Sequence, residues 1–131
     1  MNRQTDSVRV VVFDANNTNV FLVLSEKDDP ENLKLPGGKF ENETETPDQA
    51  VTRELTEELG ITKDAYNLVR VAELVNDDGI SKRFIFSTRC QASLIKPTSE
   101  VDRTQWCTEK SIPECKNSNH ILAAVKACTQ L

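Results

Sequence analysis

The chain has 131 residues, a length that suits one domain with its own hydrophobic core and is too short for two such cores. Sixteen Lys and Arg against 21 Asp and Glu give a formal net charge of -5, which argues against non-specific binding to nucleic acid, because neutralised phosphates supply most of that affinity. No apolar run approaches the roughly 20 residues that span a bilayer, and the polar start MNRQTDS has no signal-peptide character. We therefore expect a cytoplasmic protein with no membrane partner.

Two β-branched runs begin the chain. SVRVVVFD (7–14) and NVFLVLSEK (19–27) are separated by the turn-rich ANNT, and this pattern predicts a β-hairpin. The segment DDPEN (28–32) then predicts a break in regular structure before the short apolar LKLPGG (33–38).

The segment TPDQAVTRELTEELG (46–60) predicts a helix with well-marked ends. Thr46 can act as the N-cap, Pro47 suits the first helical position, and Gln49 completes a capping box with Thr46. Gly60 suits the end of the helix, where a left-handed residue is common.

The remaining elements predict a mixed sheet with at least two helices. YNLVRVAELV (66–75) and SKRFIFSTRCQASLI (81–95) are expected to be strands around the turn NDDG, where Gly79 suits a positive φ angle. DRTQWCT (102–108) predicts a further strand, and NSNHILAAVKACTQL (117–131) predicts a C-terminal helix. Its apolar side holds Ile121, Leu122 and Val125.

The predicted helix at 46–60 places carboxylates beside its apolar stripe. At about 100° per residue, the stripe lies at about 0°, 40° and 80° and is formed by Val51, Leu55 and Leu59. On the same wheel Glu58 falls at about −20°, Glu54 at about −60° and Glu57 at about −120°. Glu54 and Glu58 are therefore not simply solvent-side charges.

Two accounts of these glutamates stay open. Glu is a good helix former, and Arg53 with Glu57 makes an ordinary i, i+4 ion pair. Against that account, Glu54 and Glu58 repel each other at i, i+4, and anions near a helix C-terminus oppose the helix dipole. A cation would relieve both conflicts, and hard oxygen ligands on adjacent helical turns suit Mg²⁺.

The cysteines do not suggest a functional site. They have irregular spacings without a CxxC pair, and the chain has one histidine, His120. We expect small buried or half-buried residues in preference to a zinc site, a disulfide or Cys/His catalysis. The four positions are Cys90, Cys107, Cys115 and Cys128.

The stretch GGKFENETETPDQAVTRELTEELGI resembles the signature of the Nudix hydrolases, Gx5Ex7REUxEExGU, where U is an apolar residue. From Glu45 through Ile61 the match has no exception. Between Gly38 and Glu45, however, lie six residues where the signature has five, so the loop KFENET carries one extra residue. An insertion there leaves the helix register intact, since loops tolerate changes in length.

The resemblance implies an α/β/α sandwich for a single domain over residues 1–131, with a mixed sheet between helices. It also implies metal ligation by three carboxylates and by the backbone carbonyl of Gly38 or its neighbour. Arg53 would orient the carboxylates, with Glu45 as its ion-pair partner. Glu100, six residues before Trp106, is either a further metal ligand or base, or a plain surface glutamate. The three carboxylates are those of Glu54, Glu57 and Glu58.

The activity implied is hydrolysis of a nucleoside diphosphate linked to another group X, by metal-activated water attack on phosphorus. The cofactor would be Mg²⁺, with Mn²⁺ as an alternative, and either Glu57 or Glu100 could take the proton. A MutT-like nucleoside triphosphate pyrophosphohydrolase is favoured, as a monomer or homodimer. A Nudix-like module that binds a nucleotide without cleaving it stays open, because of the extra loop residue.

Candidate substrate contacts lie outside the helix. Lys39 and Arg83 are possible phosphate ligands or plain surface charges, and Asn117 and Asn119 are possible purine contacts or helix caps. Phe84 and Phe86 are two residues apart, so they lie on the same face of a strand. We expect them to be core residues in preference to a platform on which a base stacks.

Overall fold

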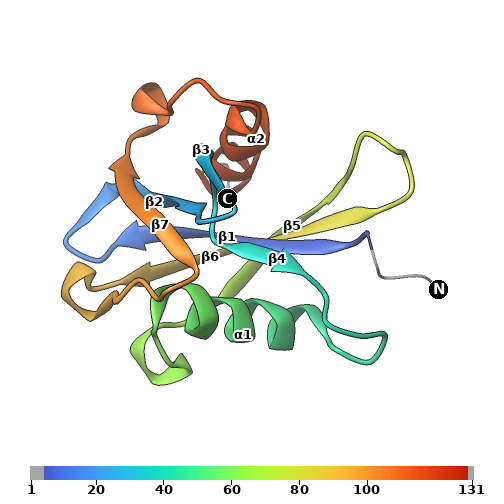
Figure 1. The fold of residues 1–131 in the computed structure, drawn as a ribbon, viewed down its shortest axis with the longest axis horizontal. Coiled ribbons are helices and arrows are strands. Elements are labelled where there is room, and N and C mark those ends of the chain that lie inside the picture. The colour runs from blue at the N-terminus through green and yellow to red at the C-terminus, as the bar shows by residue number, and fades with distance from the viewer. Residues whose placement is uncertain (1–4, 130–131) are drawn as a thin grey trace.

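The computed structural model describes residues 5–129, in which a mixed seven-stranded sheet lies between two helices (Figure 1). The strands are β1 (Ser7–Asp14), β2 (Asn17–Glu26), β3 (Asp29–Lys34), β4 (Gly37–Lys39), β5 (Val69–Val75), β6 (Lys82–Cys90) and β7 (Val101–Cys107). The helices are α1 (Pro47–Leu59) and α2 (Ser118–Thr129), and short 3₁₀ turns lie at Lys63–Ala65, Ala92–Leu94 and Glu109–Ser111. The expected α/β sandwich is confirmed.

β1 is the central strand of the sheet. The strand order is β3-β2-β1-β6-β5, with β4 paired to the first part of β1 and β7 paired to β2. β1 runs parallel to β6 over its full length and antiparallel to β2 and β4. Ser7 therefore lies between Lys39 of β4 and Arg83 of β6, which places side chains from three strands at one end of the sheet.

Each helix covers one face of the sheet, as Figure 1 shows for α1 in green and α2 in red. The stripe predicted on α1 is fully buried and packs with Val8, Val10, Phe84 and Phe86. On the other face, α2 packs through Ile121, Ala124 and Val125 against β-strand residues that include Val11 and Ile85. The core position predicted for the two phenylalanines is confirmed.

The ends of α1 follow the sequence prediction. The Gln49 N–H donates to Thr46 Oγ1 at 3.1 Å, and the Thr46 N–H donates to Gln49 Oε1 at 3.0 Å, which completes the capping box. Gly60 adopts a left-handed conformation with φ 64° and ends the helix. Gly79, in the turn between β5 and β6, likewise has a positive φ, of 74°.

Several predicted boundaries differ from those of the structure; the strand predicted at 66–75, for example, begins at Val69. The predicted break at 28–32 falls mostly within β3, which is an edge strand, the place in a sheet where a proline such as Pro30 is tolerated. The strand predicted at 81–95 ends at Cys90, and a 3₁₀ turn follows. The last helix begins at Ser118, and residues 130 and 131 of its predicted range lie outside the described residues. No helix in residues 5–129 is long and apolar enough to cross a membrane.

Candidate active site

Two of the three predicted metal-binding carboxylates of α1 are buried instead of exposed to solvent. Glu58 is 1% exposed and Glu54 is 9% exposed, whereas Glu57 is exposed on the outer side of the same helical turn. The burial expected from the helical wheel is therefore confirmed for both glutamates. Buried carboxylates are costly to keep ionised unless a cation or several hydrogen-bond donors face them.

Glu58 meets the backbone of β4 and a lysine of β3. The Gly37 N–H donates to Glu58 Oε1 at 2.8 Å, and Lys34 Nζ lies 3.7 Å from Glu58 Oε2. Burial raises the pKa of Glu58 to about 8, against the opposing attraction of Lys34. Lys34 and the Gly37 N–H are therefore the main groups that stabilise the ionised form of this buried carboxylate.

Glu54 lies against Gly38. A Cβ added to Gly38 would fall 2.8 Å from Glu54 Oε1, so the absence of a side chain at residue 38 makes room for the carboxylate. Burial raises the pKa of Glu54, and the hydrogen bond from Arg53 partly offsets that rise. The two buried carboxylates of α1 and the Gly37–Gly38 backbone of β4 thus form one polar cluster, which we call the carboxylate cluster.

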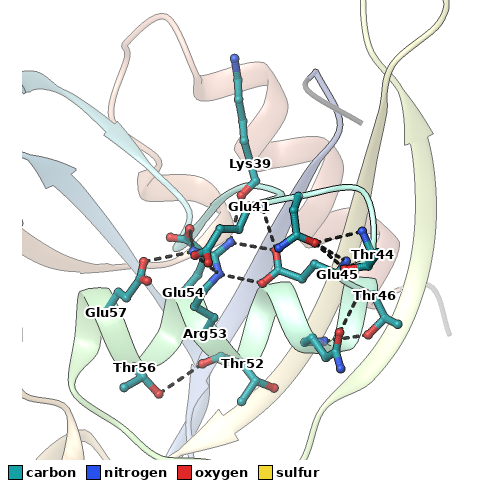
Figure 2. A network of polar contacts seen from close by, with 12 residues as sticks. Lys39, Glu41, Thr44, Glu45, Thr46, Thr52, Arg53, Glu54, Thr56 and Glu57 are labelled. Carbon is teal, nitrogen blue, oxygen red and sulfur yellow. Dashed lines mark hydrogen bonds and ion pairs between the residues drawn. The ribbon is translucent and has the colours of Figure 1, made fainter. Parts of the chain in front are cut away.

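Arg53 connects this cluster to the loop before α1 (Figure 2). Its guanidinium donates to Glu45 Oε2 at 2.7 Å and to Glu45 Oε1 at 3.1 Å. It also donates to Glu54 Oε1 at 2.8 Å and to Glu57 Oε2 at 3.1 Å. A further hydrogen bond of 3.1 Å reaches the carbonyl oxygen of Lys39. Arg53 therefore fixes two of the three helix carboxylates relative to the loop.

The loop that carries the extra residue forms a turn centred on Asn42. Asn42 Oδ1 accepts hydrogen bonds from the Thr44 N–H at 2.9 Å, the Thr44 hydroxyl at 2.7 Å and the Glu45 N–H at 3.0 Å. This side-chain turn compacts the loop between β4 and α1. Glu45 still reaches Arg53, and Gly38 still lies beside Glu54.

The cluster fits a hard divalent cation in its chemistry. Within residues 5–129, no three His, Cys, Asp or Glu side chains already form a complete metal centre, and Arg53 and Lys34 supply the positive charge near the carboxylates. The donor set is nevertheless all oxygen, and buried carboxylates with raised pKa values gain most from an added cation. Glu57 is exposed and adjoins the cluster through its hydrogen bond from Arg53.

Glu100 lies on a segment that packs against the end of α1. The Thr98 N–H donates to the Glu58 carbonyl at 3.0 Å, and the Thr98 hydroxyl donates to the Glu57 carbonyl. The Glu100 side chain itself is exposed. The structure therefore places the segment that carries residue 100 against the C-terminal turn of α1.

Three of the four predicted substrate contacts line one pocket on the α2 face, with a volume of about 240 Å³. They are Lys39, Arg83 and Asn117, whereas Asn119 is exposed and does not line it. The Asn117 amide donates to the Leu33 carbonyl at 3.0 Å and so anchors the start of α2 on β3. Lys34, which lines the pocket and approaches Glu58, joins this pocket to the carboxylate cluster.

Sequence reasoning missed two pocket cations, Arg9 and Lys34. Arg9 was visible as a lone charge inside the apolar run VRVVVF, but its neighbours are set by the pairing of β1 with β4 and β6. Lys34 lies three residues before Gly37, and nothing in the sequence around it indicates a functional role. Burial lowers the pKa of Arg9, while Glu58, Glu54 and Glu26 act in the opposite direction.

The cysteines are free, as the sequence predicted. Cys90 and Cys107 are buried, and Cys115 and Cys128 are half-buried. Burial raises the pKa of the Cys128 thiol to about 11, and it also raises the pKa values of Cys90 and Cys107. Thiols with raised pKa values are poor nucleophiles near neutral pH.

Comparison with known proteins matches the chain to one family. The family model for the NUDIX domain matches residues 3–125. A curated relative, 8-oxo-dGTP diphosphatase from Escherichia coli (strain K12), is 54% identical over 41 residues, which cover 31% of each chain. That match thus spans about a third of the length of the curated relative.

Solved structures share the fold at low sequence identity. The E. coli dihydroneopterin triphosphate pyrophosphohydrolase superposes with a TM-score of 0.76 and 22% identity, over 96% of this chain and 95% of that one. A C. elegans Ap4A hydrolase superposes with a TM-score of 0.74 and 17% identity, over 95% and 96% of the two chains. With the family match over most of its length, the chain belongs to the Nudix family.

Proposed function

We propose that this chain, as a single domain over residues 1–131, is a Mg²⁺-dependent pyrophosphohydrolase of nucleotides. Its substrate is a nucleoside diphosphate linked to a group X, with a nucleoside triphosphate or a related nucleotide as the favoured case. The observation that carries the proposal is the pair of buried carboxylates, Glu54 and Glu58, held against the backbone of Gly37 and Gly38. The proposal places the protein in the cytoplasm as a monomer or homodimer.

The proposed metal ligands are Glu54, Glu57 and Glu58, with the carbonyl of Gly38 or its neighbour. A divalent ion bound there neutralises phosphate oxygens and lowers the pKa of a water ligand, and Mn²⁺ is an alternative to Mg²⁺. Arg53 positions Glu54 and Glu57 through hydrogen bonds of 2.8 Å and 3.1 Å. Its contacts to Glu45 keep the guanidinium in place when a metal-bound substrate arrives.

The reaction is an attack of water on phosphorus. The water oxygen bonds to phosphorus as the bridging P–O bond breaks, and a carboxylate takes the released proton. Glu57 and Glu100 are the two candidates for that carboxylate. Glu57 keeps one oxygen that no contact to Arg53 occupies, and Glu100 lies on the segment that packs against the end of α1.

The names of the relatives support the substrate class. The curated relative acts on 8-oxo-dGTP, and the two structural relatives are named for dihydroneopterin triphosphate and Ap4A. All of these compounds carry a chain of phosphoanhydrides. Lys34 and Lys39 offer positive charge for such a chain beside the carboxylate cluster, and Arg83 lines the same pocket as a further substrate contact.

The test is turnover of a substrate panel by wild type and Glu57→Gln protein, with Mg²⁺ and with chelator. The panel holds dNTPs, oxidised dNTPs, sugar nucleotides and dinucleoside polyphosphates, and the assay detects released phosphate after pyrophosphatase coupling. We expect metal-dependent turnover that falls at least about 1,000-fold in Glu57→Gln, since a metal ligand is lost. Glu31→Gln, an exposed change on β3, serves as the matched control. An unchanged rate in Glu57→Gln would rule out the assigned metal site.

A nucleotide-binding module without catalysis is the second candidate. It is favoured by the positive charge that Arg53 and Lys34 already supply to the cluster. Nucleotide binding without metal-dependent turnover over the whole panel would support that candidate.

Glu100→Gln, measured beside Glu57→Gln, separates the two candidate bases, because only the base should change the acid limb of the pH–rate profile.

A further inference from the structure

The pocket beside the carboxylate cluster has an unusual lining for a nucleobase site. Among the described residues that line it, none is Phe, Tyr or Trp, none is acidic, and His120 supplies its one aromatic ring. Its apolar part is aliphatic, from side chains such as Ile85 and Ile121. A volume of about 240 Å³ is also small beside the roughly 300–1,000 Å³ typical of ligand pockets. The pocket therefore offers a purine little aromatic surface for stacking, and most of its polar lining is cationic.

The cations that line the pocket come from four strands and are Arg9, Lys34, Lys39 and Arg83. Lys34 is engaged by Glu26 and Glu58. Lys39 points away from the Arg53 network, as Figure 2 shows, and lines the pocket. This concentration of positive charge occurs in a chain whose net charge is -5, so it is not a consequence of composition.

The two arginines are held by neutral oxygens. Arg9 Nη1 donates to the Leu35 carbonyl at 3.2 Å, and Arg83 Nη1 donates to Asn76 Oδ1 at 2.9 Å. A neutral acceptor orients a guanidinium without cancelling its charge, although Glu58, Glu54 and Glu26 do act on Arg9. Each guanidinium carries five N–H donors, so each can still bind an anion. Asp77 is the acidic group that acts on Arg83, and it does not line the pocket.

The β5–β6 hairpin preorganises Arg83. Asn76 Nδ2 donates to the Ser81 hydroxyl at 2.8 Å, and that hydroxyl donates to Asp78 Oδ2 at 2.7 Å. Asn76 is therefore fixed before it accepts the bond from Arg83. A fixed guanidinium loses little conformational entropy when it binds an oxyanion.

Arg83 is also distinct in position from the lysines next to the carboxylates. Lys39 and Arg83 flank Ser7 on opposite sides of β1, so their backbones lie two strand spacings apart, about 10 Å. The first turn of α2 lies at the same pocket, where the positive end of the helix dipole adds to the potential. One end of the pocket thus adjoins the cleavage site, and the other end offers a separate anion site.

We propose that this pocket selects substrates that carry a phosphomonoester besides the diphosphate, on the nucleoside or on X, and that this phosphate binds Arg83 and Arg9 while the diphosphate is held at the carboxylate cluster. The proposal rests on the proposed function for its substrate class. It assigns the pocket to a phosphomonoester in place of a neutral purine, with Arg83 as the residue that determines specificity.

The first experiment detects the anion site without catalysis. His120 lines the pocket and is the one histidine in the chain, so its imidazole NMR signals report on the pocket unambiguously. Burial lowers the pKa of His120, Arg83 and Arg9 lower it further, and Asp77 opposes them. Inorganic phosphate, added in chelator to the folded protein, should shift these signals saturably and raise the His120 pKa.

Arg83→Gln is the diagnostic variant, because Gln keeps a donor for Asn76 and removes the charge. We expect phosphate affinity to fall at least about tenfold, the range of a lost charge-assisted hydrogen bond. Arg89→Gln, an exposed change on the same strand, is the matched control and should bind phosphate as wild type does. Equal losses in the two variants, or no saturable shift of the His120 signals in wild type, would overturn the anion site.

The second experiment compares substrates that differ by one phosphate, NADP⁺ with NAD⁺ and coenzyme A with dephospho-coenzyme A, in the presence of Mg²⁺. We expect kcat/KM to favour the phosphorylated member of a pair at least about tenfold in wild type, and the preference to disappear in Arg83→Gln. Equal rates within both pairs would overturn the proposal while leaving the pyrophosphohydrolase intact. Phosphate binding at His120 without any metal-dependent turnover would support the anion site and contradict the proposed function.

Discussion

Arg53 donates hydrogen bonds to both carboxylate oxygens of Glu45, with Nε 2.7 Å from Oε2 and Nη2 3.1 Å from Oε1. Glu45 in turn accepts the Glu41 N–H at 2.8 Å, so the guanidinium is fixed to the loop that precedes α1. The same guanidinium donates to Glu54 and Glu57. The loop therefore sets the position of two proposed metal ligands through a single side chain.

Arg53→Lys should uncouple the loop from the helix carboxylates. A lysine ammonium keeps the charge but cannot make the two-pronged contact to Glu45 while it also reaches Glu54. We expect kcat for nucleotide hydrolysis to fall at least about 100-fold with little change in KM, and unfolding free energy to fall by about 1–3 kcal/mol. Steady-state kinetics and urea unfolding measure the two effects, with Arg89→Lys as the exposed control. A change in KM alone would show that Arg53 acts on substrate binding instead.

Glu58 should make the metal-free protein less stable as pH rises. Its pKa is raised to about 8 in the folded state, so between about pH 4.5 and 8 the folded protein holds a proton that the unfolded chain releases. The stability that Glu58 contributes is complete below the unfolded pKa and is lost as pH rises through the folded pKa. The slope for one proton is at most about 1.4 kcal/mol per pH unit.

Urea unfolding in chelator at pH 5, 6, 7 and 8, with wild type and Glu58→Gln, measures this contribution. Gln keeps an oxygen for the Gly37 N–H, whose bond to Glu58 is 2.8 Å, and it does not titrate. We expect the stability difference between the two proteins to move in favour of Glu58→Gln as pH rises. Taking the difference removes the contributions of other titrating groups, including His120. A pH-independent difference would contradict the raised pKa.

The sequence was sufficient to predict α1 and its caps, because these depend on local interactions. The capping box of Thr46 and Gln49 and the left-handed Gly60 form within one helical turn of each end. Burial of Glu54 and Glu58 followed from the helical period, since both lie next to the apolar stripe. Here local rules and the final packing agree.

The pocket could not be predicted in the same way, because its residues come from strands that are far apart in the chain. Ser7 lies between Lys39 and Arg83, which are 44 residues apart in sequence (83 − 39), and the sequence does not state that pairing. Arg9 was visible as a charge in an apolar run, but its role depends on which strands flank it. β3 was missed because Pro30 indicates a break except on an edge strand.

Gly38→Ala should disturb the proposed metal site by steric contact. Its new Cβ would lie 2.8 Å from Glu54 Oε1, so the carboxylate must move away. We expect Mg²⁺ affinity and hydrolysis each to fall at least about tenfold, with a stability loss of about 1–3 kcal/mol from overpacking. Isothermal titration with Mg²⁺ and circular dichroism measure affinity and fold.

Gly79→Ala is the matched control for this change. A Cβ at residue 79 meets nothing within 4 Å, although the φ of 74° makes the substitution strained. It should cost about 1 kcal/mol of stability and leave Mg²⁺ affinity unchanged. If Gly38→Ala bound Mg²⁺ as tightly as wild type does, Glu54 would not be a ligand in its present position.

Mg²⁺ should stabilise the folded protein in proportion to its occupancy of the carboxylate cluster. An ion that binds only the folded state adds about 2.7 kcal/mol at 100 times its Kd, which corresponds to roughly 10 °C in Tm for a domain of this size. Glu57 is exposed, so Glu57→Gln should fold normally and lose most of this shift. Thermal melts over a Mg²⁺ series, with chelator to reverse the effect and Glu31→Gln as the control, measure it. An equal Mg²⁺ shift in wild type and Glu57→Gln would mean that the ion binds without this carboxylate, and the assignment of Glu57 as a metal ligand would fail.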